Sequence, residues 1–92
     1  MSINFSQSVG RIKIKNTIIQ ALKRGVILEE LIQADDELLS FIIRSMHREL
    51  YGVDESYLLM NKKIMQLTHD KQIEYIIDYY NPDLVKEFRR IV

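Results

Sequence analysis

The side chains that could do acid–base or metal chemistry are few and far apart in this chain of 92 residues. The two histidines, His47 and His69, are separated by 22 positions, so no HxxxH, HxH or HExxH spacing is present. A zinc site would need carboxylates brought to them from different helices. The chain has no cysteine, which excludes a thiolate metal site and a disulfide framework. Solvated or hydrogen-bonded histidines are the simpler prediction, with no metal and no cofactor.

Catalytic motifs of fixed spacing are absent from the sequence as well. There is no Gly-rich phosphate-binding loop and no nucleophile-elbow pattern. Any catalytic group would have to be a charged residue on a helix. We therefore predict that the protein is not an enzyme.

Charge is unevenly distributed, although the chain as a whole is neutral. Residues 1–25 hold five basic residues and no acid, whereas residues 26–56 hold eight acids against two arginines. Such asymmetry indicates either a basic arm that binds nucleic-acid phosphates or a basic helix that lies against an acidic one, within the fold or across a dimer. The predicted DNA contacts are Arg11, Lys13, Lys15, Lys23, Arg24, Lys62, Lys63 and Lys71.

Phe41 lies outside the apolar face of its predicted helix. At about 100° per residue, Leu38, Ile42 and Met46 share one arc, and Phe41 projects from the opposite side. Either another helix of the same subunit covers this ring, or it belongs to a second buried surface made with another chain. Its neighbours on that side are Arg44, Ser45 and Arg48.

Tyr75 and Tyr79 form a second aromatic feature, one helical turn apart. Tyrosine gives a large contact area with only two torsions to fix, so it is favoured at interfaces. We predict that both rings stack on one another in a partner-binding patch. The alternative is that the last helix covers them through Val85 or Phe88. The core side of the same helix is predicted to be Ile73, Ile76, Ile77 and Tyr80.

The elements that position these residues are predicted to be helices. Only one proline and three glycines interrupt the chain, which favours long helices over many strands. We expect an all-α fold, a single domain over residues 1–92 with a bundle of four to five helices. The stretch from Glu37 to Leu50 is expected to be central, because its apolar arc covers roughly 140°.

Capping residues predict where the helices begin and end. Gly25 and Gly52 are placed to terminate helices, and Asp35, Asp54 and Thr68 are placed to cap new ones. The first helix is expected at 16–24, and a break is expected near Ala34–Asp36. The central helix should end at Tyr51, and two helices should follow at 55–67 and 68–80. A short last helix should be capped by Asn81 and opened by Pro82.

The N-terminal segment, residues 1–15, is expected to be a loose or extended basic segment. Residues 12–15 alternate apolar and basic like a short strand, although Ile14, Ile18 and Leu22 follow helical spacing. A strand here would need a partner, such as its own copy in a dimer. The sequence shows neither a signal peptide nor a stretch of membrane-spanning length, so we expect a cytoplasmic protein with no membrane contact.

Between Ile32 and Arg89 the chain carries, in order, the motifs LLSFIIRSM, YGV, DES, LTHDKQI and LVKEFR. This order resembles the FlhD family of flagellar master-regulator subunits, which act in complex with FlhC. The resemblance implies a dimeric, helical transcription regulator that works with a partner subunit. A second stretch, LIQADDELLSFIIRSM, resembles the first helix of small all-helical chorismate mutases, with Ser45 at the position of that family's arginine and Arg44 one residue before it.

The predicted function is a small helical transcription-regulatory protein, an activator acting as a homodimer, with a partner subunit, or both. DNA would be contacted through the basic residues, and Phe41, Tyr75 and Tyr79 would form partner interfaces. The alternative is an adaptor that binds proteins and not DNA, of the anti-sigma, antitoxin or chaperone-like type. A chorismate-mutase-like enzyme is the third hypothesis.

Overall fold

The computed structural model describes the backbone of residues 2–92 and the side chains of residues 10–92. Every regular element in this part of the chain is helical, which confirms the all-α prediction. The Cα radius of gyration is 13.2 Å, near the roughly 12 Å expected for one compact domain of this length. The elements are α1 (Ser2–Lys23), α2 (Glu29–Ile32), α3 (Asp36–Tyr51), α4 (Glu55–Met65), α5 (His69–Tyr80), the 3₁₀ turn η1 (Pro82–Leu84) and α6 (Val85–Ile91).

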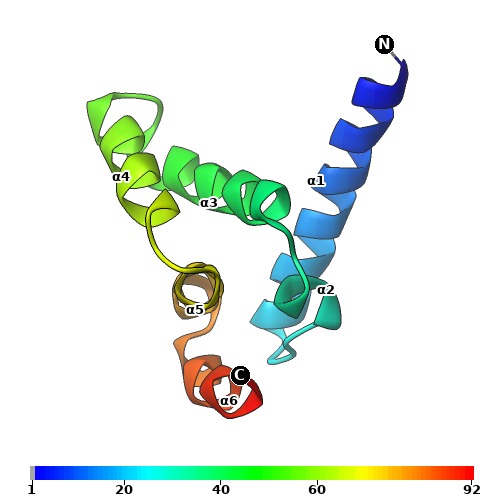
Figure 1. Ribbon diagram of the computed structural model, residues 1–92, viewed down its shortest axis with the longest axis vertical. Coiled ribbons are helices and arrows are strands. Elements are labelled where there is room, and N and C mark those ends of the chain that lie inside the picture. The colour runs from blue at the N-terminus through cyan, green and yellow to red at the C-terminus, as the bar shows by residue number, and fades with distance from the viewer. Residues whose placement is uncertain (1) are drawn as a thin grey trace.

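Helix α3 is the central element of the fold. It crosses the molecule between α1 and α4, and α5 lies beneath it, as Figure 1 shows. Burying one aliphatic side chain of this size stabilises a fold by about 1.5–3 kcal/mol. The α3 side chains with no exposed area are Leu39, Ile42, Ile43, Met46 and His47. The predicted apolar arc is therefore the side of α3 that faces the core, except that Leu50 is exposed.

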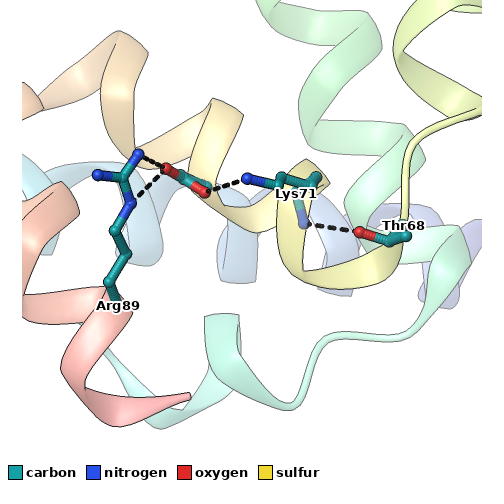
Figure 2. A network of polar contacts seen from close by, with 4 residues as sticks. Thr68, Lys71 and Arg89 are labelled. Atoms are coloured by element: carbon teal, nitrogen blue, oxygen red, sulfur yellow. Dashed lines mark hydrogen bonds and ion pairs between the residues drawn. The ribbon is translucent and has the colours of Figure 1, made fainter.

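Three of the predicted helix starts are confirmed by capping contacts, whereas the first helix begins earlier than residue 16 and the helix predicted at 55–67 ends at Met65. Asp35 Oδ1 accepts a hydrogen bond from the backbone nitrogen of Leu38 at 2.9 Å, so the break before α3 follows from an N-cap. Asp54 accepts from the backbone nitrogens of Ser56 and Tyr57 at the start of α4. Thr68 accepts from the backbone nitrogen of Lys71 at the start of α5 (Figure 2). Each of these caps lies within three residues of its donor.

The end of α1 is a glycine C-cap. Gly25 has a φ of 89°, in the left-handed region that favours glycine. Its nitrogen donates to the Leu22 carbonyl at 3.0 Å, and the Val26 nitrogen donates to the Ala21 carbonyl at 2.9 Å. This pair of bonds is the Schellman motif, which satisfies two of the carbonyls that a helix end leaves open.

The prediction of an extended segment at residues 12–15 is wrong. These residues are part of α1, which is helical without interruption to Lys23. The helical spacing of Ile14, Ile18 and Leu22 outweighs an alternation of only four residues, because Ile18 and Leu22 have no exposed area and belong to the core. A lone strand there would also leave its backbone groups unpaired. The looseness predicted for residues 1–15 is likewise not found from Ser2 onward, where α1 is helical, and Met1 lies outside the described residues.

Asn81 does not cap the last helix with its side chain, contrary to the prediction. Its amide nitrogen instead donates to the Leu22 carbonyl at 2.9 Å, across 59 residues of sequence. The last helix begins at Pro82 as a 3₁₀ turn and continues as α6. The amide of Asn81 therefore joins the end of α1 to the start of the C-terminal helix.

An ion-pair network joins α5 to α6. Arg89 Nε donates to Glu74 Oε1 at 2.9 Å, and Lys71 Nζ lies 3.6 Å from Glu74 Oε2 (Figure 2). The hydrogen bond from Arg89, more than its charge, holds the pKa of the Glu74 carboxyl below its usual value. Because the basic partners are well exposed, this network orients α6 more than it stabilises the fold.

Two glycine-to-alanine changes should affect stability with opposite signs. Gly10→Ala adds a methyl inside α1 that meets nothing within 4 Å, so the free energy of unfolding should rise by about 0.5–1 kcal/mol. Gly25→Ala should lower it by about 1–2 kcal/mol, because alanine is strained at a positive φ. Urea denaturation followed by circular dichroism measures both. Changes of the same sign would contradict the helix end described here.

Candidate functional site

Among the side chains of residues 10–92, His47 is the most deeply buried polar one, and it joins three helices. Its Nδ1 lies 2.7 Å from Asn61 Oδ1 on α4, and its Nε2 lies 2.7 Å from the Tyr75 hydroxyl on α5. An amide oxygen only accepts, so Nδ1 donates, and Nε2 of the neutral ring accepts from the tyrosine. Burial raises the pKa of Tyr75, which keeps its hydroxyl proton available for this bond. Both ring nitrogens are occupied, so the predicted hydrogen-bonded histidine is confirmed.

His69 is also engaged within the fold. Its Nε2 donates to the Ala34 carbonyl at 2.6 Å, which ties the start of α5 to the link between α2 and α3. Its Nδ1 lies 3.8 Å from a carboxylate oxygen of Asp70. Among the residues that the structure describes, no three His, Asp or Glu side chains come together as a metal site.

Three of the eight predicted DNA contacts are engaged with neighbouring side chains. Arg11 on α1 pairs with Glu37 on α3 at 2.6 Å. Lys15 on α1 donates to the Ser45 hydroxyl on α3 at 3.1 Å. Lys71 pairs with Glu74 on its own helix. The basic helix α1 thus lies against the acidic start of α3 within one subunit, which is one of the two interpretations of the charge asymmetry.

The other five predicted DNA contacts are exposed and belong to three places in the fold. Lys13 lies on the middle of α1, Lys23 and Arg24 lie at its C-terminal end, and Lys62 and Lys63 lie on α4. The end of α1 and helix α4 are on opposite sides of the molecule (Figure 1). The predicted set therefore does not form one continuous basic surface, and DNA contact stays a prediction.

Phe41 is half-buried beside α1. The ammonium of Lys15 lies 5.5 Å from the centroid of its ring, a cation–π distance. Helix α1 therefore covers part of Phe41, which agrees with the alternative that another helix of the same subunit covers this ring. The rest of the ring borders two surface hollows, one on each side.

The two hollows beside Phe41 differ in charge. The first, of about 330 Å³, has Asp36 and Glu37 in its lining together with Arg11 and Arg44, so its charges balance. The second, of about 480 Å³, lies between α1, α3 and α4, and we call it the Phe41 hollow. It contains three cations and no carboxylate. Its charged and apolar lining residues are Ile12, Lys15, Phe41, Arg44, Arg48 and Tyr57.

The two arginines of the Phe41 hollow are available to a ligand. In the described part of the chain neither Arg44 nor Arg48 pairs with a carboxylate, and residues 1–9 contain no acid. The two arginines are one helical turn apart on the exposed side of α3. Guanidinium groups bind carboxylate or phosphate, and the rings and Ile12 offer apolar contact beside them.

Sequence reasoning identified only part of this site. Phe41, Arg44, Ser45 and Arg48 follow the i, i+3, i+4, i+7 spacing of one helix face, and this signal could have added both arginines to the site. Ile12 and Tyr57 come from other helices, so only the tertiary structure places them there.

Tyr75 and Tyr79 do not stack on one another. The ring of Tyr75 packs edge-on against His47, with 5.6 Å between centroids, and it contacts the core. The ring of Tyr79 packs edge-on against Tyr80 at 4.8 Å and is 37% exposed. Tyr80 is half-buried and packs against the core that Ile73, Ile76 and Ile77 help to form, and burial raises its pKa to about 12. Of the predicted pair, Tyr79 alone keeps the exposure that a partner patch requires.

No helix in the described part of the chain is long and apolar enough to cross a membrane. Comparison with protein families, curated proteins and solved structures finds no match for this chain. The resemblances to FlhD and to chorismate mutases therefore stay predictions.

Removing one hydroxyl from each tyrosine should separate their roles. Tyr75→Phe leaves Nε2 of the buried His47 without its donor, so the free energy of unfolding should fall by about 1–2 kcal/mol. Tyr79→Phe is the matched control and should change it by less than about 0.5 kcal/mol. Urea denaturation measures both, and equal effects would rule out the hydrogen-bond network as a source of stability.

Proposed function

We propose that the protein is a small helical adaptor that binds an acidic segment of a partner protein in the Phe41 hollow. This proposal rests on one observation: the lining of the hollow combines three cations with two aromatic rings and Ile12, and it contains no carboxylate. A hollow of about 480 Å³ lies within the range of roughly 300–1,000 Å³ that is usual for binding sites.

An acidic peptide with one apolar side chain uses both parts of this surface. Its carboxylates would pair with Arg44 and Arg48, and the apolar side chain would pack against Phe41 and Tyr57. Arginine and tyrosine are the residue types on which interface binding energy concentrates, especially where neighbouring side chains exclude water. Lys15 is already held by Ser45, so it adds positive charge without having to be ordered on binding.

Duplex DNA is the weaker candidate for this site. Phosphate contacts are made by cations and hydrogen-bond donors, so they make no use of the apolar part of the lining. The chain has no net charge, and the predicted DNA contacts are distributed over separate places. The role in transcription control that the resemblance to FlhD implies is kept in this proposal, with a protein partner as the direct ligand.

The proposal is tested with a fluorescein-labelled peptide that has one phenylalanine flanked by aspartates and glutamates. We expect saturable binding by fluorescence anisotropy, and Arg44→Glu with Arg48→Glu should weaken it by about 10- to 100-fold, since two attractive contacts become repulsive. The matched control is Lys86→Glu with Arg90→Glu, which makes the same change of charge on the exposed side of α6 and should leave binding unchanged.

Two further ligands complete the experiment. A peptide with lysines in place of the acids should not bind. Duplex DNA that binds through Arg44 and Arg48, with an affinity that falls steeply with salt, while the acidic peptide does not, would replace the adaptor with the nucleic-acid role. Equal binding of the acidic and basic peptides would overturn the proposal.

A further inference from the structure

Helix α4 lies at the edge of the molecule (Figure 1), and its buried and half-buried residues leave one side of the helix exposed. It packs mainly against α3, through the buried Ile64 and the half-buried Met60 and Asn61. Its opposite side carries two leucines, Leu58 and Leu59, which are 63% and 60% exposed. Neighbouring apolar side chains this open to water usually mark an interaction site.

The exposed side of α4 has an ordered composition. Glu55, Leu58, Leu59 and Lys62 follow the i, i+3, i+4, i+7 spacing that puts them on one face of a helix. The acid lies at the N-terminal end of this stripe, the two leucines lie in its middle and the lysine lies at its C-terminal end. No ion pair in the described residues involves Glu55 or Lys62.

We propose that this stripe is a homodimer interface, in which α4 packs antiparallel against α4 of a second copy of the chain. A two-fold axis that passes between residues 58 and 59 places Leu58 opposite Leu59 of the second copy. The same axis places Glu55 opposite Lys62 of the second copy, twice by symmetry. The stripe is therefore complementary to itself in both apolar surface and charge.

Charge is what selects a second copy in this orientation. A parallel pair would put Glu55 against Glu55 and Lys62 against Lys62, and both contacts would be repulsive. The antiparallel pair also opposes the two helix dipoles, which is favourable. The stripe points away from the Phe41 hollow, because Tyr57, the α4 residue of that hollow, is about 100° around the helix from Leu58. The dimer therefore does not depend on the proposed adaptor function.

The expected dimer is weak. An 11-residue helix is only about 16 Å long, so two of them bury less than the roughly 1,200 Å² of a standard interface. Leu50 near the end of α3 and Val53 in the turn before α4 are also exposed, at 48% and 70%. We expect a dissociation constant of about 10–100 µM, which is the range of transient association.

A charge exchange tests this interface by sedimentation velocity over about 5–500 µM, a range that brackets the expected constant. Glu55→Lys alone and Lys62→Glu alone should each weaken the dimer by about tenfold, because each replaces two attractive contacts with repulsive ones. The double variant, Glu55→Lys with Lys62→Glu, should restore wild-type association. Glu55 and Lys62 are about 10 Å apart along the helix, so restoration within one chain is not expected.

One control and one further variant keep the test specific. Glu87→Lys reverses an exposed acid in the first turn of α6, as Glu55→Lys does in α4, and should leave the dimer unchanged. Leu59→Ser removes apolar surface without changing charge and should also weaken the dimer. A wild-type chain that stays monomeric to about 500 µM, or a dimer that the double variant fails to restore, would overturn the proposal.

Discussion

The structure depends on the burial of α3 against three other helices. Apolar side chains supply most of the stability and decide which side of each helix faces inward. His47 adds a directional constraint, because a buried imidazole must satisfy both ring nitrogens, and its partners are Asn61 on α4 and Tyr75 on α5. The directions of these two hydrogen bonds orient α4 and α5 relative to α3. The outward sides of α3 and α4 are consequently held in place by apolar burial together with this polar contact in the interior.

The two candidate surfaces follow from this arrangement. Turning one side of α3 into the core leaves Phe41, Arg44 and Arg48 on the side that faces outward, next to α1. Turning Ile64 inward leaves Leu58 and Leu59 outward on α4. A dimer through α4 would carry two Phe41 hollows, so a partner with two acidic segments would bind by effective concentration as well as by affinity. Weak dimerisation and weak peptide binding would then reinforce one another.

The local features of the fold were predictable from the sequence, and the long-range ones were not. Asp35, Asp54 and Thr68 mark helix starts because a cap and its donor lie within three residues, so the chemistry is visible in a short window. The partner of Asn81 lies 59 positions away, and nothing near that asparagine indicates it. The prediction for Tyr75 was wrong for a related reason. Its position on the helix suggested an exposed ring, whereas its hydroxyl is hydrogen-bonded to His47, 28 residues earlier. In the candidate site, the α3 residues share a visible period, but the contributions of α1 and α4 come from packing alone.

The order of Asn81 and Pro82 has a consequence for the chemical lifetime of the protein. Asparagine deamidates when the backbone nitrogen of the next residue loses its hydrogen and attacks the side-chain carbonyl carbon, which expels ammonia and leads to aspartate. The nitrogen of Pro82 has no hydrogen and is already fully substituted, so this cyclisation is closed to Asn81. Aspartate at this position would set a carboxylate oxygen against the Leu22 carbonyl, where the amide now donates. The proline that opens the last helix thus also protects the contact between the end of α1 and the start of the C-terminal helix against deamidation.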